Sequence, residues 1–303
     1  MIRELEYRTE DARGIVRALR ADKDMTQRNA WHLAKVSGNE LPPIASLGSA
    51  TFGLAGRSYQ GIDISAREIE AALYADGASP EGLRAMLDEV PFLVSCNDHA
   101  LGLLRLTNDA GEVFRIKAKC MELTPEKQYR RSVLFGAVFD CPVPYFETDT
   151  LFRVPFVAVE GGKEYPLERP YTFGDVSETG VKSYTVTCFN SGDVAAPCVL
   201  KLYGSGLSAV TFRNLTTGAR IVLNGMSVAE LEASTDPDNL YTLAATSAGG
   251  SMTDATAYVN PNYPLADFWL APGANSIQVT MTATSIQPAG SCIEWRGRFS
   301  ACL

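Results

Sequence analysis

The sequence has almost no histidine and none of the short motifs that mark common catalytic sites. Only His32 and His99 occur among the 303 residues. Two imidazoles exclude a histidine-rich metal site, although either could act alone as a base. The glycine-rich phosphate loops, the serine elbow of hydrolases and the paired-histidine helix of zinc proteases are also missing. We therefore expect no enzyme of these classes, no cofactor and no metal site.

The sequence also lacks a basic surplus and a long apolar run. Its net charge is −8, which leaves no electrostatic footprint for nucleic-acid binding. No stretch approaches the ~18 uncharged apolar residues that a membrane-spanning helix requires. The first residues, MIRELEYRTEDAR, alternate in charge and lack the apolar core of a signal peptide. We expect neither membrane insertion nor a secretion signal.

Cysteine is present, but its spacing predicts no cross-links. The seven cysteines are an odd number, are widely spread and include no C-x-x-C. Without a secretion signal, this pattern predicts free and mostly buried thiols. Cys96 lies three residues before His99 and could form a nucleophile–base pair, but no orienting motif follows. A turn histidine is the simpler interpretation, and a cysteine-dependent enzyme is kept as one alternative.

Two acidic stretches resemble calcium loops only at their start. DPDN at residues 236–239 is followed by Tyr241 and Ser247, where an EF-hand loop needs glycine and glutamate. Asp22 and Asp24 fail the same test. We expect hydrogen-bonded turns at both places rather than metal sites.

Hydrophobic alternation dominates the first half and predicts a β domain with one short helix. The helix is expected over Ser79–Val90, because Ser79 can cap it, Pro80 suits its first turn and Pro91 blocks its continuation. Residues 1–40 indicate a mixture of strand and loop. Strands are predicted at 61–73, 92–96 and 129–141, and two more at 101–123 on either side of a turn at 108–111.

The second half contains strand signals and no helical one. Alternating stretches occur at 183–189, 198–204, 209–215, 219–225, 276–283 and 292–299. Thr216-Thr217-Gly218 is typical of a hairpin turn. Several short strands with turns between them predict an antiparallel β-sandwich. Residues 244–260 are small and polar and predict an exposed loop or a weak edge.

The segment VFDCPVPYF, residues 138–146, marks the end of the first domain. The prolines cannot donate to a β-ladder, so they end the preceding strand and stiffen the exit. We interpret the segment as a structural seam between domains 1–148 and 149–303, rather than as a reactive cysteine loop. Its five key residues are Cys141, Pro142, Pro144, Tyr145 and Phe146.

This seam and two later turns together resemble a known family. VFDCPVPYF is similar to the Phe-x-Cys-x-Pro-Tyr segment that closes the N-terminal domain of siphophage distal tail proteins. The C-terminal half is similar to that family's C-terminal domain in the order and spacing of two turns. The first turn has Asn214, Thr217, Gly218, Ile221 and Leu223, and the second has Leu270, Pro272, Gly273, Asn275 and Ile277. Residues 1–40 are the weakest match.

The resemblance implies a non-enzymatic structural protein of a tail tip or baseplate. In that family, a β-barrel-like N-terminal domain forms a ring and a galectin-like sandwich follows it. The implied homo-hexamer joins the tail tube protein to the tail hub and supports receptor-binding proteins in many members. DNA passes through the ring without specific binding. The implied location is the virion tail tip, after assembly in the host cytoplasm, and a gene transfer agent tail would fit equally well.

A carbohydrate-binding module or lectin is the other alternative. Sandwich domains often carry a sugar site, and Phe268, Trp269 and Trp295 could line one. Trp295, however, alternates with Ile293 on what should be the inner face of a strand. We therefore expect Trp295 to belong to the core.

Overall fold

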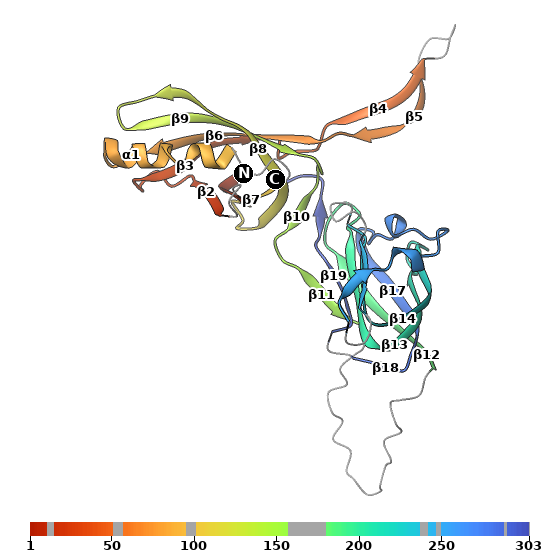
Figure 1. Cartoon of the computed structure of the whole chain (residues 1–303). Coiled ribbons are helices and arrows are strands. Elements are labelled where there is room, and N and C mark those ends of the chain that lie inside the picture. The colour runs from red at the N-terminus through yellow and green to blue at the C-terminus, as the bar shows by residue number, and fades with distance from the viewer. Residues whose placement is uncertain are drawn as a thin grey trace, which may run out of the picture. The chain divides into compact units, whose positions relative to one another are not determined.

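The computed structural model describes residues 1–10, 15–50, 57–94, 101–156, 180–236, 242–246, 250–287 and 290–302. They form two compact units (Figure 1). The first unit is Met1–Asp149 together with Phe299–Leu303, and the second is Thr150–Arg298. The sequence pattern had assigned residues 299–303 to the C-terminal domain. They belong to the first unit because their contacts lie there. Both units are built mainly of strands, which confirms the predicted class.

The first unit is a closed barrel of seven strands. In order around the barrel they are β8, β7, β1, β2, β3, β6 and β9, and β9 closes on β8. The short strand β10 pairs with the first part of β8, and β20 lies beyond it. The bounds are β1 (Ile2–Glu10), β2 (Val16–Asp22), β3 (Ala30–Ser37), β6 (Arg67–Asp76), β7 (Gly102–Asn108), β8 (Val113–Gln128), β9 (Ser132–Cys141), β10 (Phe146–Thr148) and β20 (Arg298–Phe299).

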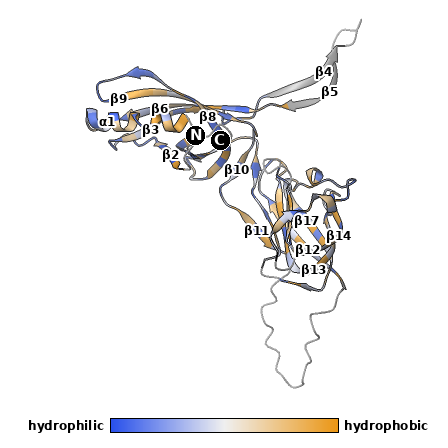
Figure 2. Ribbon diagram, viewed as in Figure 1, coloured by the Kyte–Doolittle hydropathy of each residue, from blue (hydrophilic) through white to orange (hydrophobic). Residues whose placement is uncertain are grey.

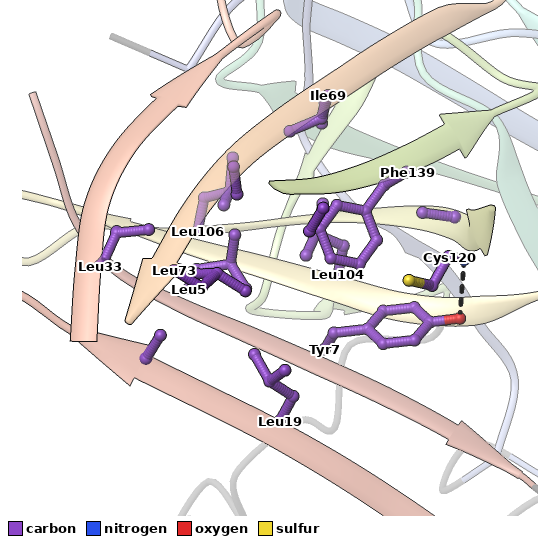
Figure 3. Packing of buried hydrophobic residues seen from close by; sticks show 14 of the residues in the cluster. Leu5, Tyr7, Leu19, Leu33, Ile69, Leu73, Leu104, Leu106, Cys120 and Phe139 are labelled. Carbon is purple, nitrogen blue, oxygen red and sulfur yellow. Dashed lines mark hydrogen bonds between the residues drawn. The ribbon is translucent and has the colours of Figure 1, made fainter. Parts of the chain in front are cut away.

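The barrel interior is filled by every second side chain along its strands. Along β6 and β9 every second residue is buried, and β9 was predicted from that period. The single strand predicted at 61–73 is instead two strands, because one strand ends at Ile64 and β6 begins at Arg67. Figure 3 shows Leu5, Tyr7, Leu104 and Phe139 meeting in the interior. The hydroxyl oxygen of Tyr7 accepts a hydrogen bond from the backbone nitrogen of Cys120 at 3.2 Å, so the one polar atom of that ring is satisfied.

One neighbouring pair of strands in the barrel is parallel, and its contact is short. The other neighbouring strands of the barrel are antiparallel, whereas β2 and β3 run parallel and share two residue pairs, Ala21 with Trp31 and Asp22 with His32. His32 is buried there, with its Nδ1 atom 3.9 Å from a carboxylate oxygen of Asp22.

Two helices replace the single predicted one. Helix α1 (Pro80–Leu87) begins as expected, with the Ser79 hydroxyl accepting from the backbone nitrogen of Gly82. It ends at Leu87, and α2 (Val90–Val94) follows. Pro91 falls in the first turn of α2, where its missing N–H costs nothing, so it starts a second helix instead of only ending the first. The predicted strand at 92–96 is therefore wrong for residues 92–94.

One hairpin stands apart from the barrel sheet. Strands β4 (Ile44–Ala50) and β5 (Arg57–Ile64) pair with each other and form a two-stranded sheet of their own (Figure 1). An isolated two-stranded hairpin is marginally stable in water. The pairing of these two strands alone therefore gives the hairpin little stability.

The second unit is the predicted antiparallel sandwich of galectin type. Its strands are β11 (Phe152–Pro155), β12 (Gly180–Asn190), β13 (Cys198–Asn214), β14 (Arg220–Ser234), β15 (Leu243–Thr246), β16 (Met252–Asp254), β17 (Gly273–Ala283), β18 (Ser285–Ile286) and β19 (Cys292–Trp295). Two 3₁₀ turns, η2 (Thr256–Tyr258) and η3 (Leu265–Asp267), complete it. Strands β15 and β16 form a short hairpin at the edge, in agreement with the weak edge predicted for 244–260.

Two long strands serve both layers of the sandwich. The first half of β13 pairs with β19 and its second half with β17, while β14 follows it on the other side. The pairing register of β13 with β14 shifts between Tyr203 and Ala209, and Gly206 lies there at φ 62°. Such irregularities bend a strand and let it change layers.

The sandwich core lies between those layers. Figure 2 shows hydrophobic and hydrophilic residues alternating along its strands. Leu200, Phe212 and Val279 are fully buried in this core, and Trp295 is 4% exposed, as predicted for a core residue.

Candidate functional site

The two signature turns of the C-terminal half meet in the folded chain. The first follows β13 and contains Asn214, Thr217 and Gly218, and the second precedes β17 and contains Pro272 and Gly273. They are joined because Leu215 donates its backbone N–H to the carbonyl oxygen of Ser276, while Ser276 donates to the hydroxyl of Thr216 at 3.0 Å. Sequence spacing had grouped each turn separately, and the structure brings them together.

Asn214 holds the first turn from within. Its Oδ1 atom accepts from the backbone nitrogens of Thr216 at 3.0 Å and Thr217 at 3.2 Å. Its Nδ2 atom donates to the carbonyl oxygen of Trp269 and to Oδ1 of Asn275. The side chain is fully buried, so these bonds replace water completely. Gly218 closes the turn at φ 82°, a value that L side chains rarely adopt.

Asn275 holds the second turn in the same way. Its Oδ1 atom accepts from the backbone nitrogen of Ala271 at 2.9 Å, and its Nδ2 atom donates to the carbonyl oxygens of Ala271 and Gly273. Gly273 lies at φ 85°. Leu270 forms a bridge with Ala196, and Leu270 also accepts from the side chain of Asn190. Pro272 is an exposed residue of this turn. The signature residues thus form a cluster of hydrogen bonds that holds the two turns together.

The seam residues all lie in the first unit. Cys141 is the last residue of β9 and is fully buried, and burial raises the pKa of its thiol to about 12. Pro142 is exposed, Pro144 is buried, and Tyr145 leads into β10. Phe146 begins β10 and is fully buried in the barrel core. The unit boundary follows at Asp149.

A buried arginine lies beside this seam, and the sequence analysis missed it. The Arg67 guanidinium lies 4.5 Å from the ring centre of Phe146 and donates to the carbonyl oxygens of Gly38 and Ser300. It is 1% exposed, and burial lowers its pKa. Because it is the first inward-facing residue of β6, on the same face as Ile69, the alternation of that strand was a signal that could have identified it.

The segment Phe299–Cys302, called here the returning segment, completes this region. Asn39 donates its side-chain amide to the carbonyl oxygen of Cys302 at 2.6 Å and accepts, at its backbone carbonyl, the N–H of Cys302. The ring of Phe299 meets that of Phe114 edge to face at 5.3 Å. The first unit is therefore built from both ends of the chain.

Most of the candidate chemistry from the sequence is either buried or outside the described residues. Cys96 and His99 lie outside them, as does most of the DPDN stretch. The six described cysteines are free and buried, as expected. Asp24 accepts from the backbone and hydroxyl of Thr26 in a turn, as predicted. Among the described residues, no group of three or more His, Cys, Asp or Glu could hold a metal ion. Over the same ranges, no helix is long and apolar enough to cross a membrane.

A row of ion pairs covers one outward part of the barrel. Arg105 pairs with Glu6 at 3.4 Å and with Asp149 at 2.9 Å, and Arg115 pairs with Glu147 at 2.9 Å. Each such surface pair contributes little stability. Together they give this part of the barrel surface alternating charge.

The closed barrel followed by an antiparallel sandwich is similar in fold to solved structures of phage tail and baseplate proteins. The crystal structure of Dit (gp 19.1) of phage SPP1, described as a paradigm of the hub adsorption apparatus in phages infecting Gram-positive hosts, matches with a TM-score of 0.59 and 12% identity. The match covers 89% of this chain and 93% of that chain.

Two structures of the phage P2 baseplate in its activated conformation match as well. The Ca form gives a TM-score of 0.51 at 13% identity over 99% of this chain and 98% of the other. The Sr form gives 0.52 at 13% identity over 98% of each chain. The resemblance inferred from the sequence is thus confirmed at the level of the fold. No protein-family model and no curated protein matches the chain by sequence.

Proposed function

We propose that this chain is a structural component of a phage tail tip or baseplate, located in the virion. The observation that carries the proposal is the fold, which is shared with phage distal tail and baseplate proteins over nearly the full length of both partners. The hydrogen-bonded signature turns and the buried thiols fit a structural role. The polar atoms of the two asparagines are hydrogen-bonded inside the fold, and the thiols are buried there.

In this proposal six copies form a ring that connects the tail tube protein to the tail hub and supports receptor-binding proteins. The β4–β5 hairpin supports this assembly. It pairs with no other described strand, and a two-stranded hairpin gains stability when another surface covers it. A neighbouring copy in the ring would supply that surface.

The ring would also form a channel for DNA. Six copies at −8 each carry a formal charge of −48. Such a charge discourages DNA from adhering to the ring as it passes. The acidic balance of the chain therefore supports a conduit rather than a nucleic-acid-binding surface.

Native mass spectrometry and negative-stain imaging of the whole chain test the proposal. We expect six-fold rings, in isolation at high concentration or on addition of the tail tube protein. Replacing residues 44–64 by a short Gly-Ser linker should abolish the rings and leave the circular dichroism of the remaining strands intact. A strict monomer under all these conditions would contradict the proposal.

A further inference from the structure

The sandwich has an outward-facing cavity whose lining residues, apart from Gly218, are not among the signature residues of the two turns. Its volume is about 440 Å³, within the range of small-ligand sites. It lies beside the β13–β14 hairpin and the segment before η3. Its lining residues are Arg213, Gly218, Ala219, Arg220, Asn262, Tyr263 and Asp267.

Two positive charges are held side by side in this cavity. Arg213 and Arg220 are directly opposite each other in the β13–β14 ladder, and both point outward. Like charges at such positions are destabilising. Among the described residues, neither arginine forms an ion pair, although Asp267 also lines the cavity.

The second arginine is held in place by an aromatic residue. The Arg220 guanidinium lies 3.7 Å from the ring centre of Tyr263 and donates to its hydroxyl oxygen. This contact covers one face of the ring and fixes the charge at the cavity wall. The Arg220 guanidinium is thereby fixed in the cavity that Arg213 also lines.

The surroundings offer both donors and acceptors for hydroxyl groups. Asn262 and Asp267 lie on one side of the arginine pair. On the other side, Gln278 is opposite Arg213 in the β13–β17 ladder, and Thr185 is opposite Gln278 in the β12–β17 ladder. The result is a polar row across the outer face of one layer. Ala219 is the one aliphatic side chain in the cavity lining, and the ring of Tyr263 is its one aromatic group.

We propose that this cavity binds a saccharide that carries an acidic group, a carboxylate or a phosphate. The two guanidiniums would receive the anionic group, because planar guanidinium donors match both oxyanions. The neighbouring amide and carboxylate would bind sugar hydroxyls. The inference deepens the proposed function, on which it rests, since a tail tip meets the cell surface.

Isothermal titration of the full chain with four probes tests the proposal. The probes are glucuronate, glucose 1-phosphate, glucose and inorganic phosphate. We expect glucuronate or glucose 1-phosphate to bind, and the stronger of the two identifies the acidic group. Glucose and inorganic phosphate should each bind at least about tenfold more weakly than that probe, because each offers only half of the contacts.

Matched variants locate the site. Arg213→Gln with Arg220→Gln should weaken binding of the acidic sugar by about tenfold or more. Arg130→Gln with Arg131→Gln removes the same charge from an exposed turn of the first unit and should leave binding unchanged. Asn262→Asp, which is isosteric and adds a negative charge at the cavity, should also weaken binding. Equal binding by the first variant and the wild type, or inorganic phosphate binding as tightly as glucose 1-phosphate, would overturn the proposal.

Ring formation is measured on the same samples. Rings without binding of any acidic sugar would refute this inference alone. Binding of an acidic sugar that is sensitive to the two arginines, in a chain that forms no ring, would refute the proposed assembly and support the cavity as a binding site.

Discussion

The side-chain amide of Asn214 donates to the side-chain oxygen of Asn275 at 3.2 Å, across 61 residues of sequence. Both side chains are essentially inaccessible to water. Each asparagine organises its own turn, and this bond joins the two turns in addition to the bonds between Ser276 and the first turn. The coupling explains why the two turns form one structural unit.

Replacement of Asn214 by Ala should destabilise the sandwich by about 2–4 kcal/mol, because several buried backbone groups lose their partner. The double variant Asn214→Ala, Asn275→Ala should cost less than the sum of the single changes. Urea unfolding followed by tryptophan fluorescence measures this selectively in a Trp31→Phe background, because the other two tryptophans, Trp269 and Trp295, lie in the second unit. Asn262→Ala, on the exposed surface, is the control. Additive effects would show that the two turns are independent.

Arg67→Ala should destabilise the first unit by about 2–4 kcal/mol, because the guanidinium stacks on Phe146 and satisfies two backbone carbonyls in a buried place. Deletion of residues 299–303 should act in the same direction. Hydrogen exchange with mass spectrometry should show faster exchange in peptides that contain Asn39 and β6, and unchanged exchange in β13 and β17. Arg84→Ala, an exposed change in α1, is the control. Protection that survives deletion of residues 299–303 would contradict a locking role for them.

Alkaline pH should destabilise the fold through its buried thiols. Burial raises the pKa of Cys188 from 9.0 to about 12. An unfolded chain releases this proton near pH 9, whereas the folded chain retains it. The stabilising contribution is therefore complete below pH 9 and is lost as the pH rises toward about 12. Urea midpoints should fall less steeply with pH for Cys188→Ala than for the wild type, while tyrosine and lysine titrations act equally on both. Parallel curves would contradict this account.

Two glycines should differ in their tolerance of a side chain. Gly218 lies at φ 82° with open space around it, so Gly218→Ala should cost about 1–2 kcal/mol from backbone strain, and Gly218→Asn less. At Gly192 an added Cβ would lie 1.8 Å from the carbonyl oxygen of Arg298, so Gly192→Ala should prevent the second unit from folding normally. The melting temperatures of the two alanine variants measure these effects: backbone strain in Gly218→Ala and steric overlap in Gly192→Ala. Similar melting temperatures would be inconsistent with these geometries.

The strands were largely predictable because burial on one face leaves a period of two in the sequence. Phe135, Ala137 and Phe139 show it in β9, and Ile277, Val279 and Met281 show it in β17. The end of α1 was not predictable in this way. A proline after an amphipathic stretch can end one helix or begin another, and the sequence around Pro91 is compatible with both.

The closure of each unit was not predictable either, because it depends on contacts between distant residues. The parallel pairing of β2 with β3 involves two residue pairs and leaves no periodic signal. Asn214 bonds to Asn275, and Arg67 bonds to Ser300. Each bond joins two segments that are far apart in the sequence, and the local pattern of one segment does not predict its contact with the other. The arginine pair in the sandwich cavity became visible only through the register of β13 with β14.

The chain leaves the first unit at Asp149 and re-enters it at Phe299, and this has a consequence for synthesis on the ribosome. Translation delivers the barrel strands first, the whole sandwich second and the partners of Arg67 and Asn39 last. The sandwich therefore has all its strands available before the barrel receives its final contacts. A nascent chain completes its two units in the reverse of the order in which it begins them, and a chain truncated by premature termination carries a barrel that lacks these contacts.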